Sequence, residues 1–221
     1  MNLIAAPFAH WLLLIALLIS GGLILHAATR IAWFALSQEQ LTGWFGASVV
    51  VLGFWQMKAS IQPGLSFHLL GASALAMIAG RDKALLGLAA VLAADTAYGH
   101  GEWASFGLSY LIIAFIPVTL AHALLTWAQR ALPANYFIYI FVNCFAASAL
   151  SMWSVGLLTC GFLAASGAYP LDFLLEEQLP YYFLLGWPEG FSSGIYLTLL
   201  VVWRPEWVST FNDAFYLTHK N

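Results

Sequence analysis

The sequence consists largely of long runs of apolar residues, separated by short segments that carry the few basic residues. Hydrophobic residues make up 62% of the 221 residues and charged residues only 8%, whereas an average soluble domain has roughly 25% charged residues. A helix needs about 20 residues to cross the hydrocarbon core of a bilayer. The chain is therefore expected to be an all-α integral membrane protein.

About seven apolar segments can form membrane-spanning helices. No low-complexity linker divides them, so we expect residues 1–221 to form a single polytopic membrane domain. The third and fourth segments have only about fifteen residues each, and these spans are expected to be short or re-entrant. The predicted spans are 8–33, 43–57, 66–80, 84–98, 105–129, 135–166 and 181–203.

The basic residues predict the orientation, because Lys and Arg concentrate in the cytoplasmic loops of membrane proteins. With seven spans and the N-terminus outside, six of the seven basic residues fall on the cytoplasmic side and only Lys58 lies outside. The C-terminus is then cytoplasmic, and we expect a multi-pass protein of the cell inner (plasma) membrane, surrounded by the lipid bilayer. The six cytoplasmic residues are Arg30, Arg81, Lys83, Arg130, Arg204 and Lys220.

Several ionisable residues lie at the outer ends of the predicted spans. His68 opens the third span, Asp95 lies one turn below the outer end of the fourth, and His100 and Glu102 follow in a short loop. Ionisable groups at membrane depth are costly, so each one calls for a partner, a cavity or a function. Imidazole and carboxylate are ligands that divalent transition metals accept. The sequence therefore predicts a metal site, open to the outer face, that includes His68, Asp95, His100 and Glu102.

Structural roles are the alternative explanation for some of these residues. Glu102 could favour the N-terminus of the fifth helix through the helix dipole, and Asp95 could cap the turn that the neighbouring glycines mark. His10 suits an interfacial anchor. Cys144 and Cys160, sixteen residues apart in one apolar stretch, are expected to be buried free thiols.

Other classes of function find no support in the sequence. It has no GxSxG, HExxH or Walker motif and no GxGxxG after a predicted strand, so we expect neither an enzyme nor an organic cofactor. The scattered basic residues form no patch suited to nucleic acid. Without a Walker motif, the energy for any transport has to come from a partner or from a gradient.

Two motifs resemble one known family. Residues 56–71 read QMKASIQPGLSFHLLG and lead into glycines at the ends of the next two predicted spans, and residues 187–207 contain a Pro-Glu-Gly span followed by Arg-Pro-Glu. Both are similar to the CbiM/NikM family, the metal-capturing membrane subunits of energy-coupling-factor cobalt and nickel importers. The matching residues are Gln56, Met57, Pro63, Gly64, Ser66, His68, Leu69, Leu70, Gly71, Gly80, Gly99, Gly101, Glu189, Gly190, Arg204, Pro205 and Glu206.

The resemblance implies seven helices with an external N-terminus, metal binding by His68, and partners in the form of a coupling transmembrane subunit and cytoplasmic ATPases. Family members begin Met-His, and their amino group, second amide nitrogen and second side chain hold a metal in a square plane that suits Ni(II). This sequence has Asn2 instead, while His100 stands where the family more often has Asp. The metal is then expected to be held through His68 with Asp95, His100 or Glu102.

Three functions follow as hypotheses. The first is the membrane component of transition-metal uptake, which captures a divalent ion such as Co or Ni as its substrate at the outer face. The second is a membrane metalloprotein that uses the same histidines for redox chemistry or for staging a metal. The third is an assembly factor that keeps the family fold with its site partly lost.

Overall fold

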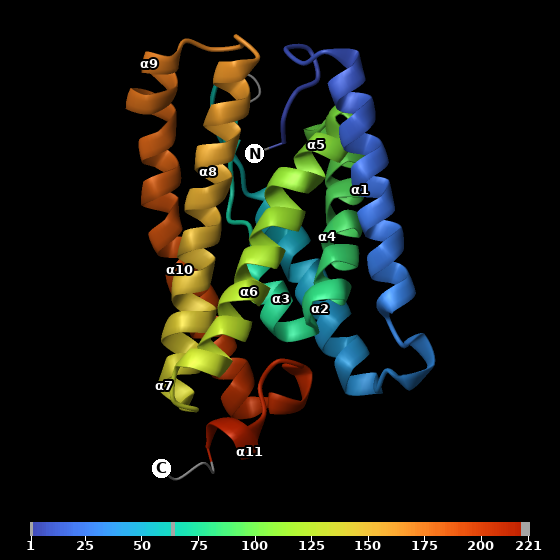
Figure 1. Cartoon of the computed structure of the whole chain (residues 1–221), viewed down its shortest axis with the longest axis vertical. Coiled ribbons are helices and arrows are strands. Elements are labelled where there is room, and N and C mark those ends of the chain that lie inside the picture. The colour runs from blue at the N-terminus through green and yellow to red at the C-terminus, as the bar shows by residue number, and fades with distance from the viewer. Residues whose placement is uncertain (1, 63–64, 218–221) are drawn as a thin grey trace.

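Figure 1 shows the computed structural model, an elongated bundle whose longer helices run roughly along its long axis. The structure describes residues 2–62 and 65–217, so Pro63, Gly64 and Lys220, which entered the sequence arguments, lie outside the described residues. Three helical stretches are long and apolar enough to cross a membrane, namely His10–Arg30, Trp103–Ala131 and Tyr136–Ala165. The prediction of a helical membrane protein is confirmed.

The helices follow one another up and down the bundle (Figure 1). Short π-helical or 3-10 turns join several of them into longer stretches. In chain order the helices are α1 (His10–Arg30), α2 (Gln38–Gln56), α3 (Ala72–Ala79), α4 (Arg81–Asp95), α5 (Phe106–Tyr110), α6 (Ile116–Ala131), α7 (Tyr136–Ile138), α8 (Ala147–Ala165), α9 (Leu171–Phe173), α10 (Leu179–Trp203) and α11 (Asp213–Tyr216).

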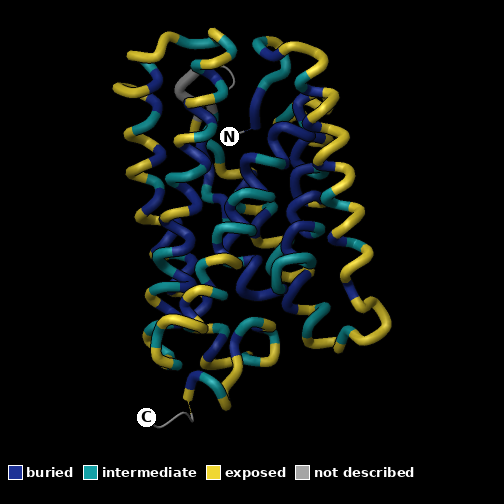
Figure 2. Tube along the Cα trace, viewed as in Figure 1, coloured by how far each residue is buried: buried dark blue, intermediate teal, exposed yellow. Residues whose placement is uncertain are grey.

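The exposed faces of the outer helices are apolar. Leu14, Leu18 and Leu25 of α1 are 57%, 67% and 67% exposed. Figure 2 shows that the buried residues gather in the interior of the bundle. In water these faces would form a large exposed apolar patch, whereas in a bilayer they contact lipid tails.

Local sequence accounts for two irregular features of the helices. Ser37 begins α2 with a capping box, in which its hydroxyl accepts from the Gln40 amide at 3.2 Å and the Gln40 side chain accepts from the Ser37 amide at 3.4 Å. A π-helical turn, Leu111–Phe115, ends two residues before Pro117, the second residue of α6. Proline has no amide hydrogen and crowds the preceding turn, so the helix adjusts its hydrogen bonding there.

The third predicted span begins differently from the prediction. Strands β1 (Ala59–Gln62) and β2 (Leu65–Phe67) pair as an antiparallel hairpin, in which Ala59 lies opposite Phe67. Helix α3 begins only at Ala72, although the apolar run starts at 66. The hairpin pairs backbone groups across its two strands, and its return brings His68 to the entrance of α3.

Helix α3 is the buried centre of the bundle, and both of its ends are held. Seven of its eight residues are buried. At its start Gly71 adopts a left-handed conformation with φ of 63°, and a Cβ there would lie 2.7 Å from Val51. At its end, the Ile78 carbonyl accepts from the Ser209 amide at 2.8 Å and the Met77 carbonyl from the Thr210 hydroxyl at 2.7 Å.

A close approach between α1 and α5 supports a stability prediction. A Cβ on Gly107 of α5 would lie 2.4 Å from the Leu17 backbone nitrogen of α1, so Gly107→Ala forces the two helices apart. We expect a loss of about 1–3 kcal/mol in unfolding free energy, measured by thermal or denaturant unfolding in detergent. Gly22→Ala on α1 is the control, because nothing lies within 4 Å of its Cβ position. Equal stability of the two variants would contradict this packing.

Candidate metal site

The segment before α1 folds back into the bundle, as the trace near the N label in Figure 1 shows. Leu3 is 2% exposed. Its amide donates to the Ser109 hydroxyl at 3.1 Å, and its carbonyl accepts from the Ser105 hydroxyl. The Ala5 amide donates to a Glu102 carboxylate oxygen at 2.7 Å. The polar residues around the start of α5 therefore hold the N-terminal segment inside the bundle.

Asp95 is the centre of a polar cluster at the end of α4. Its side chain is fully buried, and its carboxylate accepts hydrogen bonds from Lys58 Nζ at 2.6 Å, Asn2 Nδ2 at 2.6 Å and Gln56 Nε2 at 3.2 Å. The Nδ1 atom of His100 lies 3.1 Å from the same carboxylate. The Lys58 side chain is only 12% exposed. This pair places opposite charges in direct contact away from water, and the neighbouring hydrogen bonds occupy both carboxylate oxygens.

Asn2 joins this cluster to the N-terminal segment. Besides Asp95, its side-chain nitrogen donates to the His100 carbonyl at 3.0 Å. Its Oδ1 atom is buried and has no hydrogen-bond partner within residues 2–62 and 65–217. A Cβ on Gly101 would lie 3.0 Å from the Asn2 side chain, so the glycine leaves room for the segment to pack against this loop.

His68 carries the one feature here that matches a metal ligand. It is 3% exposed, and its ring packs against Trp55 with centroids 4.8 Å apart. Its Nδ1 lies 2.9 Å from the Leu69 carbonyl, so Nδ1 carries the proton. Nε2 then has a lone pair, and it is buried without a partner in the part of the chain that the structure describes. A ligating histidine commonly donates its other N–H to a backbone carbonyl, as His68 does.

The four predicted ligands do not form one cluster. Asp95 and His100 are in contact, Glu102 bonds the Ala5 amide, and His68 makes its polar contact to Leu69. Across the described residues, no group of three or more His, Cys, Asp and Glu side chains is arranged to hold a metal ion. A site at His68 therefore has to draw on other atoms, such as backbone or amide groups.

Sequence reasoning missed the partners of Asp95. Lys58 entered the sequence analysis only as the one basic residue on the outer side. Asn2 entered it only as the position that lacks the family's imidazole. One signal was available, because a lysine and an aspartate at the same end of adjacent spans are costly unless they pair. Nothing in the sequence indicated that Asn2 would reach them. The turn-capping alternative for Asp95 also missed the ion pair.

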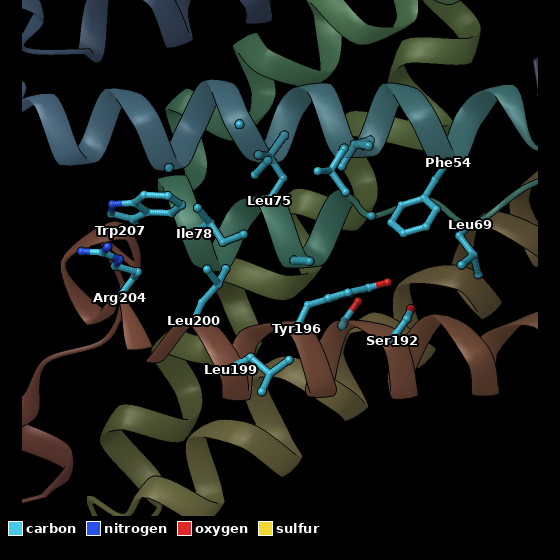
Figure 3. Close-up of a pocket in the computed structure, with 18 of the residues that line it drawn as sticks. Phe54, Leu69, Leu75, Ile78, Ser192, Tyr196, Leu199, Leu200, Arg204 and Trp207 are labelled. Carbon is cyan, nitrogen blue, oxygen red and sulfur yellow. The ribbon is translucent and has the colours of Figure 1, made fainter. Parts of the chain in front are cut away.

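A separate cavity of about 450 Å³ lies between α2, α3 and α10 (Figure 3). Leu69, Gly71 and Glu189 line the part next to His68, while Arg204 and Trp207 line the other end. Most of the lining between them is apolar, including Phe54, Leu75 and Leu200 in Figure 3. Such a surface does not replace the hydration of a cation, so this cavity is distinct from the candidate site.

Fold and site together define a helical membrane protein that has a buried potential imidazole ligand and an N-terminal segment inserted into the bundle. The sequence profile of the cobalt uptake substrate-specific transmembrane region, CbiM, matches residues 4–207. The chain belongs to this family, whose members are membrane components of metal uptake. Comparison with curated proteins found no significant match.

Two solved structures are similar in fold. One, described as a truncated transition metal transporter, has a TM-score of 0.78 and 15% sequence identity over 91% of this chain and 99% of its own. The other, described as a transition metal transporter, has a TM-score of 0.78 and 14% identity over 90% of this chain and 92% of its own. At these identities the similarity supports the fold alone.

The Asp95 cluster generates a stability prediction. Asp95→Asn leaves the Lys58 charge buried without its counter-ion, and we expect a loss of about 3–5 kcal/mol in unfolding free energy. The double variant Lys58→Met with Asp95→Asn should recover part of that loss, as a double-mutant cycle in detergent would measure. The control is Asp82→Asn, which removes an exposed 4.0 Å pair with Arg30 and should cost at most about 1 kcal/mol. Similar losses for Asp95→Asn and Asp82→Asn would refute the role of the buried pair.

Proposed function

We propose that this chain is the substrate-capture subunit of an energy-coupling-factor type importer, and that it binds a divalent transition-metal ion such as Co or Ni at its outer face. Membership of the cobalt uptake family supports the class of function. The observation that carries the site is the buried Nε2 of His68, which has no hydrogen-bond partner among the described residues. Because the chain has no Walker motif, a coupling transmembrane subunit and cytoplasmic ATPases supply the energy.

His68 is the first ligand in this proposal. The His100 side chain, 40% exposed, is the second imidazole on the same side and the one that an arriving ion meets first. The Asp95 carboxylate already accepts from Lys58 and Asn2, and the Glu102 carboxylate accepts from the Ala5 amide. Their role is to hold the N-terminal segment in the bundle, and they become ligands only if those bonds open.

A matched pair of variants tests the site. Purified protein should bind Co(II) or Ni(II), and His68→Ala should weaken that binding more than about 100-fold, beyond the range typical of outer-shell residues. His26→Ala is the control, because this exposed histidine lies near the C-terminal end of α1, away from the N-terminal segment. Titration calorimetry and metal analysis measure the effect. Equal binding by the two variants would refute the His68 site.

The assembly-factor alternative has one observation in its favour. Lys58 places a positive charge 2.6 Å from Asp95, in the neighbourhood where the importer would bind a cation. If the wild-type protein binds no Co or Ni under conditions in which it is folded, that alternative replaces capture. Measured metal uptake by cells expressing the chain with coupling-factor partners then separates import from metal staging or redox chemistry.

The proposal includes a topology of seven spans in one domain, with the N-terminus outside and the C-terminus cytoplasmic. The chain directions in Figure 1 support it, because the C-terminal end of α1, the turn from α3 to α4, and the C-terminal ends of α6 and α10 lie at the lower end. Four of the basic residues lie at these positions, namely Arg30, Arg81, Arg130 and Arg204. Lys58 follows α2, which runs toward the opposite end.

Cysteine labelling in intact cells tests this topology. Cys144 and Cys160 are free and buried, as the sequence predicted, so an impermeant maleimide should not label the parent chain. We expect it to label Asp172→Cys, which is exposed in α9 at the proposed outer side, but not Ala35→Cys in the exposed segment after α1. Labelling of Ala35→Cys but not of Asp172→Cys would show that the protein has the opposite orientation.

A further inference from the structure

Glu189 makes the most specific buried polar contact outside the Asp95 cluster. Its side chain comes from α10, is 1% exposed, and accepts two hydrogen bonds of 2.8 Å. The Leu70 amide donates to Oε2 and the Gly71 amide donates to Oε1. Each carboxylate oxygen thus receives one backbone donor from the segment that connects His68 to α3.

This carboxylate is costly where it lies. No Lys, Arg or His side chain among the residues that the structure describes forms an ion pair with it. The adjoining cavity is largely apolar. A buried ionisable group with so little compensation lowers stability unless its contacts contribute something else. Two backbone amides are held by it, and those amides lie next to the candidate ligand.

The contact reaches His68 through a single peptide unit. The Leu70 N–H that donates to Glu189 and the Leu69 C=O that faces His68 Nδ1 belong to the same planar peptide. Glu189 therefore fixes the orientation of this peptide plane. The Leu69 carbonyl in that plane in turn sets the tautomer of the His68 ring and the direction of Nε2. Trp55 holds the next peptide, because its indole N–H donates to the Leu70 carbonyl at 2.9 Å.

We propose that Glu189 is a positioning residue for metal capture, which acts on His68 through the Leu69–Leu70 peptide. The arrangement is equivalent to the carboxylate–histidine pairs that orient metal ligands, with a peptide group inserted between the carboxylate and the ring. Hydrogen bonds in such a chain polarise one another. This inference rests on the proposed function, since it gives Glu189 a role only if His68 binds the ion.

The variant Glu189→Gln tests the proposal with almost no change in size. A carboxamide has one acceptor oxygen and one donor nitrogen, so one of the two backbone amides would face another donor. We expect Co(II) affinity to fall about 10- to 100-fold, measured by calorimetry on purified protein. The visible absorption of bound Co(II) should shift, because ligand geometry changes. Faster hydrogen exchange at Leu70 and Gly71 should accompany both effects.

The matched control is Ser192→Ala. Ser192 lies three residues further along α10 and lines the same cavity, and its hydroxyl donates within its own helix to the Glu189 carbonyl at 3.2 Å. The Ser192→Ala variant should bind Co(II) with the affinity of the wild type. Affinity and Co(II) spectrum of Glu189→Gln equal to those of this control would overturn the proposal, provided that His68→Ala has lost binding.

The outcomes separate this inference from the proposed function. If His68→Ala binds Co(II) as tightly as the wild type, the capture site itself is wrong and the positioning role falls with it. If Glu189→Gln is not recovered in folded form, Glu189→Asp decides, because it keeps two acceptor oxygens but is too short to reach both amides in place. A smaller loss of affinity in the same direction supports the proposal, and unchanged affinity overturns it.

Discussion

The end of the bundle that holds the N-terminal segment depends on how the charge of one buried carboxylate is compensated. Asp95 has no exposure to solvent, and Lys58 at 2.6 Å supplies the opposite charge. Two charges removed from water are favourable only with good geometry and further hydrogen bonds. Asn2 and Gln56 complete that set, so the same contacts that neutralise Asp95 fix the N-terminal segment. The insertion of that segment into the bundle is thus a consequence of electrostatics.

Asn2 therefore has a structural role in this chain, because its side chain anchors the N-terminal segment. Where the resembling family places an imidazole, this chain has an amide that bonds Asp95 and the His100 carbonyl. These contacts insert the N-terminal segment into the bundle, although its second residue has no imidazole to offer a metal.

Sequence alone predicted the helical membrane class and the family, because apolar length and a His-Leu-Leu-Gly motif are local signals. It also predicted that His68 binds a metal, since a histidine at the mouth of a short span is costly without a function, and that role stays a prediction. The hairpin before α3 was missed because its short apolar run reads equally well as the start of a helix. The Asp95 cluster was missed because it joins positions 2, 58 and 95, which only the tertiary fold brings together.

The pairing of Lys58 with Asp95 also bears on how the chain enters the membrane. In the proposed orientation, Lys58 is the one basic residue that has to reach the outer side. Moving a positive charge outward across a bilayer works against an inside-negative potential, at about 2.3 kcal/mol per 100 mV. Lys58 lies in the outer loop before α3. Asp95 and Glu102 lie at the outer loop that follows α4. If the two loops cross in one step, they transfer no net positive charge, and the membrane potential does not oppose their insertion.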